Sequence, residues 1–213
     1  MDYQTLLMVK PIEPPIKLLL ITDSKRFTNQ QAMLDCIAQA MQGGVDTVLL
    51  REKHLDSAKL LSLASKLRIL TQAHQARLII HSHADIAQAV AADGVHVDSQ
   101  SIAEIKPIKQ WLAGDYLVSA SCHNVEELKH AETQGADFCF LSPVFPTQSH
   151  PGAPSLGSEK FLNLVAKVSI PVVALGGIEP DVLKQLQGHG VATMGAILNA
   201  KDPEQAAKAL LHQ

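Results

Sequence analysis

The chain has 213 residues, of which 46% are hydrophobic and 18% are charged, and its formal net charge is −3. The apolar content is enough for the core of a large α/β domain, and the slightly acidic balance without a basic run argues against nucleic acid as the main partner. Three scattered cysteines without C-x-x-C spacing predict neither a disulfide framework nor a zinc ribbon. The sequence shows no signal-peptide pattern and no apolar run of membrane-spanning length, so we expect a cytoplasmic protein that contacts no membrane.

Residues 1–15 contain three prolines and are predicted to form an extended N-terminal arm, and residues 16–213 a single domain. In this domain, short apolar runs alternate with longer segments of helical periodicity. The predicted strands span 17–22, 46–51, 77–81, 94–97, 116–121 and 138–142, followed by two glycine-ended runs within 171–180 and 190–197. The predicted helices span 29–42, 56–73, 84–91, 102–111, 125–134, 159–167, 181–187 and 203–211.

Eight strand–helix repeats with short connections are typical of a (β/α)8 TIM barrel, an α/β fold in which a parallel sheet closes on itself. An open, doubly wound sheet is the alternative that the same pattern permits. Because TIM barrels carry their chemistry at the carboxyl ends of the strands, we take the residues that follow each predicted strand as the candidate site.

Two of the predicted strands end at glycine. Gly176 and Gly177 follow one run, and Met194 and Gly195 follow the other. Glycine has no side chain to block a close approach, and the free amides at the start of the next helices point toward an anion bound there. The two turns together predict a phosphate-binding cup, although glycine after a strand is also ordinary turn chemistry.

Basic side chains follow the second predicted strand. The guanidinium of Arg51 and the ammonium of Lys53 suit a phosphate or carboxylate group of a ligand, and the alternative is a solvated run of charges. Histidines stand at or beyond four strand ends, at positions 81, 96, 123 and 150. Imidazole titrates near neutral pH and can act as a general acid or base, whereas no short ligand motif indicates a metal held by these histidines.

At the end of the fifth predicted strand, a cysteine and the histidine that follows it are expected on opposite faces. Alternation along a strand sends Ser121 and His123 to one face and Cys122 to the other. Cys122 is therefore predicted to be a small buried residue between barrel and helices, not a nucleophile activated by His123.

The connection over residues 143–154 is long for a strand–helix loop. Loops of this length are often lids or binding segments, and its polar groups Thr147, Ser149 and His150 are expected to close over a charged ligand. An inert surface loop is the alternative.

An ordered series of motifs resembles the thiamin phosphate synthase/TenI family over nearly the whole chain after the arm. The motifs are Leu50-Arg-Glu-Lys53, Ala92-Asp-Gly-Val-His96, Ser121-Cys-His123, Gly135-Ala-Asp137, Pro143-Val-Phe-Pro-Thr147 and Ala174-Leu-Gly-Gly-Ile178. The runs that begin at Ser121 and Ser149 also resemble the synthase-like domain that some Nudix proteins carry at their C-terminus.

The resemblance implies a (β/α)8 barrel that binds a phosphorylated thiazole. Synthases of the family join a hydroxymethylpyrimidine diphosphate to a thiazole phosphate, with magnesium holding the leaving diphosphate. The TenI branch includes tautomerases that move a proton on a thiazole carboxylate phosphate with a histidine after the fifth strand. The matching positions are Gly176, Gly177, Met194 and Gly195 for the phosphate cup, Arg51 and Lys53 for the basic pair, and Ser121 and Thr147 for the polar wall.

Three positions depart from the synthase pattern. Ser82 stands where synthases place the aspartate of Ile-Asn-Asp, Ser101 where they place a second acidic residue, and His150 where they place a lysine. Magnesium requires hard anionic oxygens, and a neutral hydroxyl supplies no charge. The departures predict no protein metal site, with Asp98 as the carboxylate that a shifted loop would offer instead.

We therefore expect a TenI-like thiazole tautomerase that needs no metal or other cofactor, with His123 as general acid/base and with His81, Ser149 and His150 among the residues that contact the substrate. A thiamin phosphate synthase with an altered magnesium site is the first alternative, and a non-catalytic barrel that senses a phosphorylated ligand is the second. The expected partner is a small phosphorylated heterocycle. The sequence leaves the exact substrate and a homo-oligomeric state open.

Overall fold

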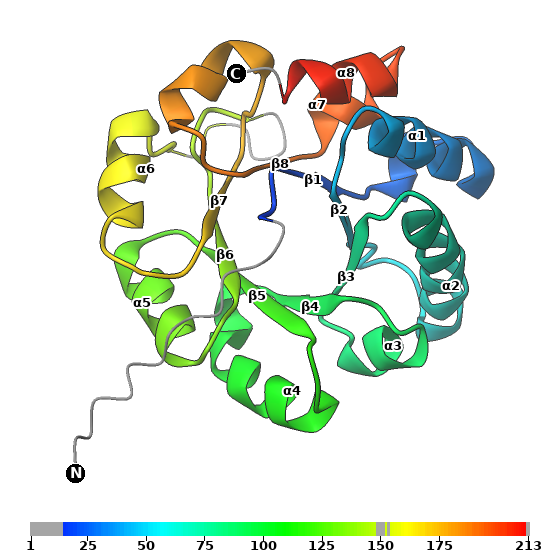
Figure 1. The fold of residues 1–213 in the computed structure, drawn as a ribbon, viewed down its shortest axis with the longest axis horizontal. Coiled ribbons are helices and arrows are strands. Elements are labelled where there is room, and N and C mark those ends of the chain that lie inside the picture. The colour runs from blue at the N-terminus through cyan, green and yellow to red at the C-terminus, as the bar shows by residue number, and fades with distance from the viewer. Residues whose placement is uncertain (1–14, 148–151, 153, 212–213) are drawn as a thin grey trace.

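The structure, a computed structural model, describes residues 15–147, 152 and 154–211. Eight parallel strands form a closed barrel in sequence order, and helices surround it (Figure 1). Because β8 pairs with β1, the sheet has no free edge, which confirms the predicted barrel and excludes the open sheet. The strands are β1 (Leu18–Ile21), β2 (Thr47–Leu50), β3 (Arg77–His81), β4 (Gly94–Val97), β5 (Leu117–Cys122), β6 (Phe138–Leu141), β7 (Val172–Leu175) and β8 (Val191–Thr193).

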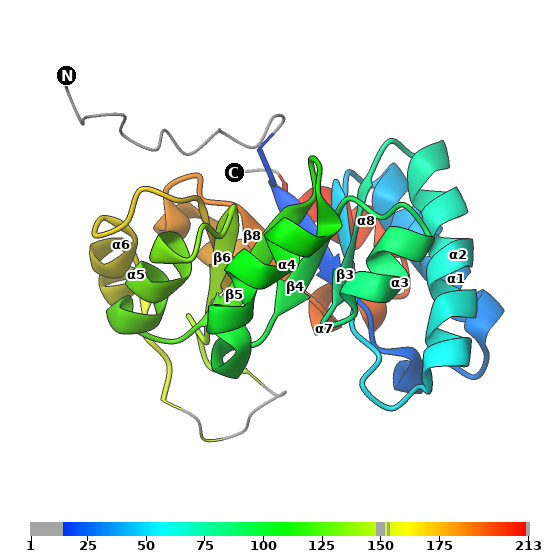
Figure 2. The same cartoon turned by 90° about the horizontal axis from the view of Figure 1, so that it is seen from below.

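The helical elements follow the strands around the barrel, as the side view in Figure 2 shows. The α-helices are α1 (Gln30–Gln42), α2 (Ser57–Ala73), α3 (Ala84–Ala89), α4 (Ile105–Leu112), α5 (Val125–Thr133), α6 (Ser158–Val165), α7 (Gly195–Leu198) and α8 (Pro203–Ala209). Three further segments are 3-10 helices, η1 (Ser24–Arg26), η2 (Ser99–Glu104) and η3 (Pro180–Leu186). Among the described residues, no helix is long and apolar enough to cross a membrane.

Two predicted helices differ from the structure in type or extent. The segment predicted as a helix over 181–187 is the 3-10 helix η3, and the segment predicted over 102–111 begins as η2 and continues as α4. Within η2, Ser101 leaves helical geometry, with φ −106° and ψ 16°, so η2 is itself kinked there. Hydrophobic periodicity does not distinguish short 3-10 turns from α-helices, because both bury one face. The short elements η1 and α7 were not predicted.

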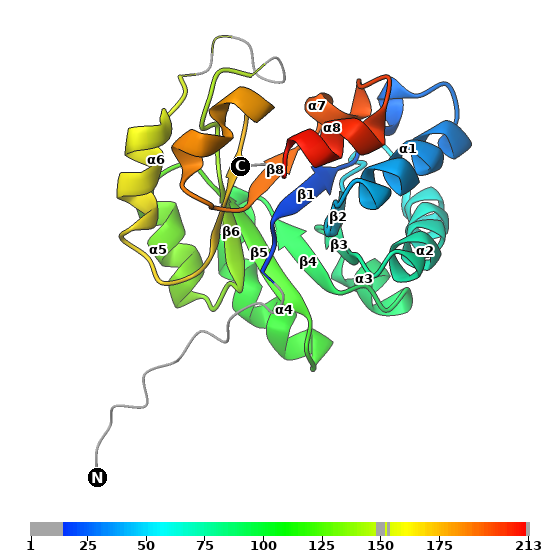
Figure 3. The same ribbon diagram turned by 45° about the horizontal axis from the view of Figure 1, so that its top comes forward.

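The core has two layers. Alternate strand residues such as Leu19, Ile79 and Phe140 fill the inside of the barrel, and their neighbours on the outer face pack against the helices. This arrangement explains why the strands are almost uniformly apolar, since both faces are buried. Cys122 belongs to the outer layer and is fully buried, which confirms the prediction that it packs between barrel and helices. Figure 3 shows α7 and α8 beside β1 and α1, where the last repeat meets the first.

Aspartates brace the amino ends of the strands, opposite the candidate site. Asp46, Asp93 and Asp137 come directly before β2, β4 and β6. Each carboxylate accepts a hydrogen bond from a backbone N–H near the start of the preceding strand, β1, β3 or β5, at 3.2, 2.7 and 2.7 Å. These bonds fix strand register at the base of the barrel and leave the carboxyl ends free to vary.

Residues 1–14, which make up almost all of the predicted arm, lie outside the described part of the chain.

Candidate functional site

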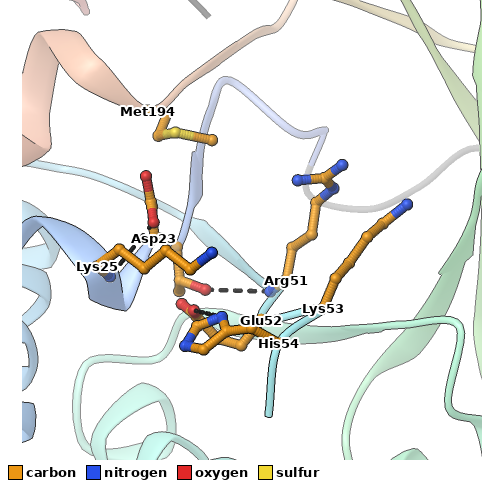
Figure 4. A pocket seen from close by; sticks show the side chains of 8 residues that line it. Asp23, Lys25, Arg51, Glu52, Lys53, His54 and Met194 are labelled. Carbon is orange, nitrogen blue, oxygen red and sulfur yellow. Dashed lines mark hydrogen bonds and ion pairs between the residues drawn. The ribbon is translucent and has the colours of Figure 1, made fainter.

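Two adjoining cavities lie at the carboxyl ends of the strands. The larger has a volume of about 450 Å³ and lies where β1, β2 and β8 end, with Thr22, Lys25, Arg51, Lys53, His54 and Met194 among its lining residues (Figure 4). The smaller has a volume of about 240 Å³, and its polar lining includes Lys53, His81, Ser82 and Asp98. Glu52 and Lys53 line both cavities, so the two spaces adjoin, and together they are called the mouth of the barrel below.

The end of β2 supplies the basic groups predicted for ligand binding. The backbone N–H of Arg51 donates to the hydroxyl of the buried Thr22 at 3.0 Å, which holds the end of β2 against β1. Figure 4 shows the Arg51 and Lys53 side chains projecting in the same direction. Lys53 lies 3.4 Å from the Asp98 carboxylate, in a half-exposed pair, and the Arg51 guanidinium has no hydrogen-bond partner among the described residues. Arg51 therefore has its full donor capacity available for an anion.

A third cation, Lys25, was not singled out from the sequence. It lies on η1, and its side chain has no partner among the described residues while lining the larger cavity. The buried carboxylate of Glu52 holds this turn, because it accepts from the Ser24 N–H at 2.9 Å and from the Ser24 hydroxyl at 2.7 Å. Asp23 pairs with Arg26 at 2.9 Å and so leaves Lys25 unpaired. The sequence shows Glu52 as one member of a charged run, and its burial against η1 depends on tertiary structure.

His81 lies in the smaller cavity at the end of β3. Its ring is 7% exposed, and its Nδ1 lies 2.9 Å from the Ser82 hydroxyl. Burial, followed by the nearby cations Lys53 and Arg51, lowers the pKa of His81 from 6.5 to about 4, against the opposing effect of Asp98. His81 is therefore neutral at physiological pH and offers the ligand a hydrogen bond instead of a charge.

Ser121 belongs to a hydrogen-bonded chain inside the barrel. His96, which is 2% exposed, lies 2.9 Å from the Ser119 hydroxyl through Nδ1 and 2.8 Å from the Ser121 hydroxyl through Nε2. Its ring packs on Phe140 with centroids 4.6 Å apart. The three polar residues line up because β4 and β5 pair His96 with Ser119, and strand alternation puts Ser121 on the same inward face. Of the three, only Ser121 is partly exposed, at the carboxyl end of β5, and it lines neither of the two cavities.

His123 and Ser121 have different hydrogen-bond partners in the structure. β5 ends at Cys122, so His123 is no longer constrained by strand alternation. Its side chain is 49% exposed, and Nδ1 lies 3.0 Å from the Glu127 carboxylate of α5, which also accepts the His123 N–H at 2.8 Å. His123 lines neither cavity, whereas Ser121 bonds to His96. The two residues expected to share one face thus have different partners.

The glycine turn after β7 contacts the loop that follows β6. Gly176 and Gly177 have φ values of +99° and +64°, and their Cα atoms face Pro143, Phe145 and Pro146. The Phe145 N–H donates to the Gly176 carbonyl at 3.0 Å, and the amides of Gly176 and Gly177 donate no hydrogen bond among the described residues. A side chain at either glycine would displace the loop, while the amides stay available to an anion.

The other predicted contacts are divided between the described and undescribed parts of the chain. Met194 lines the larger cavity, and Gly195 begins α7. Thr147 is the last residue described before the gap in the β6–α6 loop, and Ser149 and His150 lie outside the described residues.

The mouth carries few groups suited to a divalent cation. Among the residues that the structure describes, no three histidine, cysteine or carboxylate side chains converge as a metal site would require. The acidic side chains that line the smaller cavity are Asp98, which is paired with Lys53, and the buried Glu52, whose carboxylate accepts from Ser24. Ser101 is bound into η2 through its N–H, which donates to the Asp98 carbonyl at 3.0 Å. The donor set does not fit a resident magnesium ion, and it fits one held by a single carboxylate together with ligand phosphate oxygens.

The closed (β/α)8 barrel defines a TIM-barrel protein, with cations and free backbone amides at the carboxyl ends of its strands. A family profile described as thiamine monophosphate synthase matches residues 18–199. The chain therefore belongs to the thiamin phosphate synthase/TenI family, as its motifs predict.

Several known proteins that align with most of this chain are named as synthases. A protein of Aquifex aeolicus named putative thiamine-phosphate synthase 2 is 38% identical over 85% of this chain and 95% of its own length. A thiamine-phosphate synthase of Methanobrevibacter smithii is 33% identical over 93% of this chain and 95% of its own. The solved structure of a thiamine phosphate pyrophosphorylase from Pyrococcus furiosus superposes with a TM-score of 0.80 at 31% identity, covering 92% of this chain and 93% of that one. These names favour the synthase alternative and give no support to the tautomerase expectation.

Proposed function

We propose that this chain catalyses the transfer for which its relatives are named, the joining of a hydroxymethylpyrimidine diphosphate to a thiazole phosphate. The observation that carries the proposal is the family match over residues 18–199, together with relatives named thiamine-phosphate synthase that align over nearly their whole length. The cations Lys25 and Arg51 at the mouth support it, because both substrates are phosphorylated anions.

The glycine turns and the cations have separate roles in this proposal. The amides of Gly176, Gly177 and Gly195 bind the thiazole phosphate, since peptide N–H groups donate to phosphate oxygens without the bulk of a side chain. Arg51 and Lys53 bind the diphosphate at the end of β2, with Lys25 as a third cation of the larger cavity. Ser121 and Thr147 orient the ring systems between the two anionic ends.

Magnesium enters this proposal only with the diphosphate. Asp98 is the protein group that would hold it, and the ion would neutralise charge on the leaving diphosphate. For Asp98 to bind the ion, the 3.4 Å pair with Lys53 must open, and this pair is half-exposed and inexpensive to break. Lys53 is then free to contact the diphosphate itself.

The deciding experiment supplies both substrates, with and without magnesium, and measures thiamin phosphate. We expect magnesium-dependent product, reduced at least about tenfold in Arg51→Ala and in Asp98→Asn, because each removes a charge that faces the diphosphate. Glu104→Gln, an exposed change on η2, is the matched control and should keep wild-type turnover. A correctly folded wild-type protein that forms no thiamin phosphate at any magnesium concentration would exclude the transferase.

The second candidate is metal-independent tautomerisation of a thiazole carboxylate phosphate, as expected from the sequence. The observation that favours it is the presence of Ser82 and Ser101, neutral side chains where the synthase pattern has carboxylates. A further supporting contact is the 3.0 Å pair of His123 with Glu127, since a carboxylate commonly orients an imidazole base.

Proton transfer tests this second candidate directly. If it is correct, the protein will exchange the ring proton of a thiazole carboxylate phosphate in deuterated buffer containing a chelator, and His123→Gln will abolish the exchange while retaining ligand binding. His130→Gln, on the exposed face of α5, is the matched control. Ligand binding without exchange or transfer would instead assign the barrel to the sensor alternative.

A further inference from the structure

A buried imidazole joins two serines of β5 inside the barrel. His96 lies between them, with Nδ1 2.9 Å from the Ser119 hydroxyl and Nε2 2.8 Å from the Ser121 hydroxyl. Ser119 is fully buried, whereas Ser121 is half-buried near the end of the strand. The three groups form one hydrogen-bonded line that runs from the core toward the carboxyl end of β5.

The protonation state of His96 determines which groups of this line donate and which accept hydrogen bonds. Burial holds the pKa of His96 well below its ordinary value, and the neighbouring His81, Arg51 and Lys53 lower it further. A neutral imidazole carries one proton, so one ring nitrogen donates a hydrogen bond and the other accepts one. The direction of both serine contacts is therefore set by the choice of tautomer.

The buried hydroxyl of Ser119 decides between the two tautomers. If Nδ1 carried the proton, it would donate to Ser119, and the Ser119 O–H would itself need an acceptor. Within the described part of the chain, His96 is the sole hydrogen-bond partner of the Ser119 hydroxyl, and a buried donor without an acceptor is costly. If Nε2 carries the proton, Ser119 donates to Nδ1 and Nε2 donates to Ser121. Every buried donor then has an acceptor.

We propose that His96 is a positioning residue that fixes Ser121 as a hydrogen-bond donor. Its Nε2–H occupies a lone pair of the Ser121 oxygen, so the Ser121 O–H points away from the imidazole and is available to another acceptor. This inference rests on the proposed function for the contact between Ser121 and a ligand, and the polarity of the line itself does not depend on it.

The polarity predicts the chemical class of the ligand group that Ser121 recognises. A fixed O–H donor pairs with an acceptor, such as a ring nitrogen of an azole or pyrimidine or a carboxylate oxygen, and it rejects a ring N–H at the same place. The pyrimidine and the thiazole of the two proposed substrates both carry unprotonated ring nitrogens, which are acceptors of this kind. His96 thereby acts on specificity from a position that no ligand reaches.

The first test measures the tautomer in the ligand-free protein. In protein labelled with 15N-histidine, the His96 resonances are assigned as those lost in His96→Gln. We expect Nε2 to carry the proton and Nδ1 to be bare. A protonated Nδ1, or a doubly protonated ring, at neutral pH would overturn the proposal whatever the protein binds.

The second test follows the affinity for hydroxyethylthiazole phosphate by calorimetry. We expect Ser121→Ala to weaken binding about three- to tenfold, as the loss of one hydrogen bond predicts. His96→Gln places an amide N–H near the position of Nε2 and should bind within about twofold of wild type, whereas His96→Asn matches only Nδ1 and should resemble Ser121→Ala. The double variant His96→Asn/Ser121→Ala should bind no more weakly than Ser121→Ala alone.

Additive losses in the double variant would show that His96 acts independently of Ser121 and would overturn the positioning role. A wild-type protein that binds no thiazole phosphate would contradict the proposed function instead, and the tautomer measurement would still decide the inference.

Discussion

His81 shows what burial beside cations does to a titratable residue. Its pKa falls from 6.5 to about 4 because the ring is buried and Lys53 and Arg51 disfavour its charged form. The unfolded chain therefore binds more protons than the folded protein between these pH values, and stability decreases as the pH falls. A wild-type protein should lose roughly 2 kcal/mol through His81 alone between about pH 8 and about pH 5.

Replacing this residue tests the assignment. In His81→Gln, urea unfolding should show a smaller loss of stability over the same pH range, by about the same 2 kcal/mol. His96 titrates in the same direction, because burial also lowers its pKa, so part of the pH dependence should remain. An unchanged pH dependence in His81→Gln would show that His81 is not the group responsible.

Position 177 requires glycine for two reasons, its positive φ and the close contact of its neighbours. It has φ +64°, and an added Cβ would lie 2.8 Å from the Cβ of Phe145. Gly135, after α5, has φ +85° and nothing within 4 Å of an added Cβ. Thermal or urea unfolding should show that Gly177→Ala costs about 2–4 kcal/mol and Gly135→Ala about 1 kcal/mol. Equal losses would mean that the contact with the loop does not matter.

At the scale of elements, carboxylates make different kinds of contact at the two ends of the barrel. At the base, Asp137 accepts from the Val118 N–H at 2.7 Å and pairs with Lys109 at 2.8 Å, and Asp46 and Asp93 make similar contacts with other strands. At the mouth, Glu52 secures η1 through Ser24. Base contacts set register between strands, whereas mouth contacts position loops that face the ligand.

This division predicts that base variants affect stability without affecting ligand binding. Asp137→Asn should lower the free energy of unfolding by about 2–3 kcal/mol, because the backbone donor of Val118 and the ammonium of Lys109 lose their charged acceptor. Asp115→Asn, at an exposed position before β5, should change it by less than about 0.5 kcal/mol. Calorimetric affinity for a thiazole phosphate should be equal in both variants, and a loss confined to Asp137→Asn would contradict the division.

At the scale of the whole molecule, the chain is weakly acidic, and its cations gather locally at the mouth. The net charge is −3, while Lys25, Arg51 and Lys53 line the larger cavity together with Asp23, which pairs with Arg26, and Glu52, which accepts hydrogen bonds from Ser24. Attraction of an anion is therefore local and depends on a few exposed cations, which salt screens over about 10 Å at about 0.1 M. The affinity for a phosphorylated ligand should weaken as sodium chloride rises from about 0.05 M to about 0.5 M.

Lys25 should account for part of this salt dependence. Lys25→Ala should bind a phosphorylated ligand about two- to fivefold more weakly at low salt and show a smaller salt dependence, because one unpaired cation is removed. Lys66→Ala on α2, where the ammonium donates to Gln30 at 2.6 Å, is the matched control and should bind like wild type. Identical salt dependence in all three proteins would place the ligand away from η1.

The sequence by itself determined the barrel, because eight apolar runs alternating with helical segments leave few other ways to bury both faces of every strand. It also determined the family and which residues stand at the strand ends, since these follow from motifs and local order along the chain. Only the tertiary structure decided how those residues are paired. Glu52 buried against Ser24, His96 between two serines and His123 on Glu127 all depend on contacts between segments or on side-chain direction beyond a strand end, and neither periodicity nor spacing encodes these.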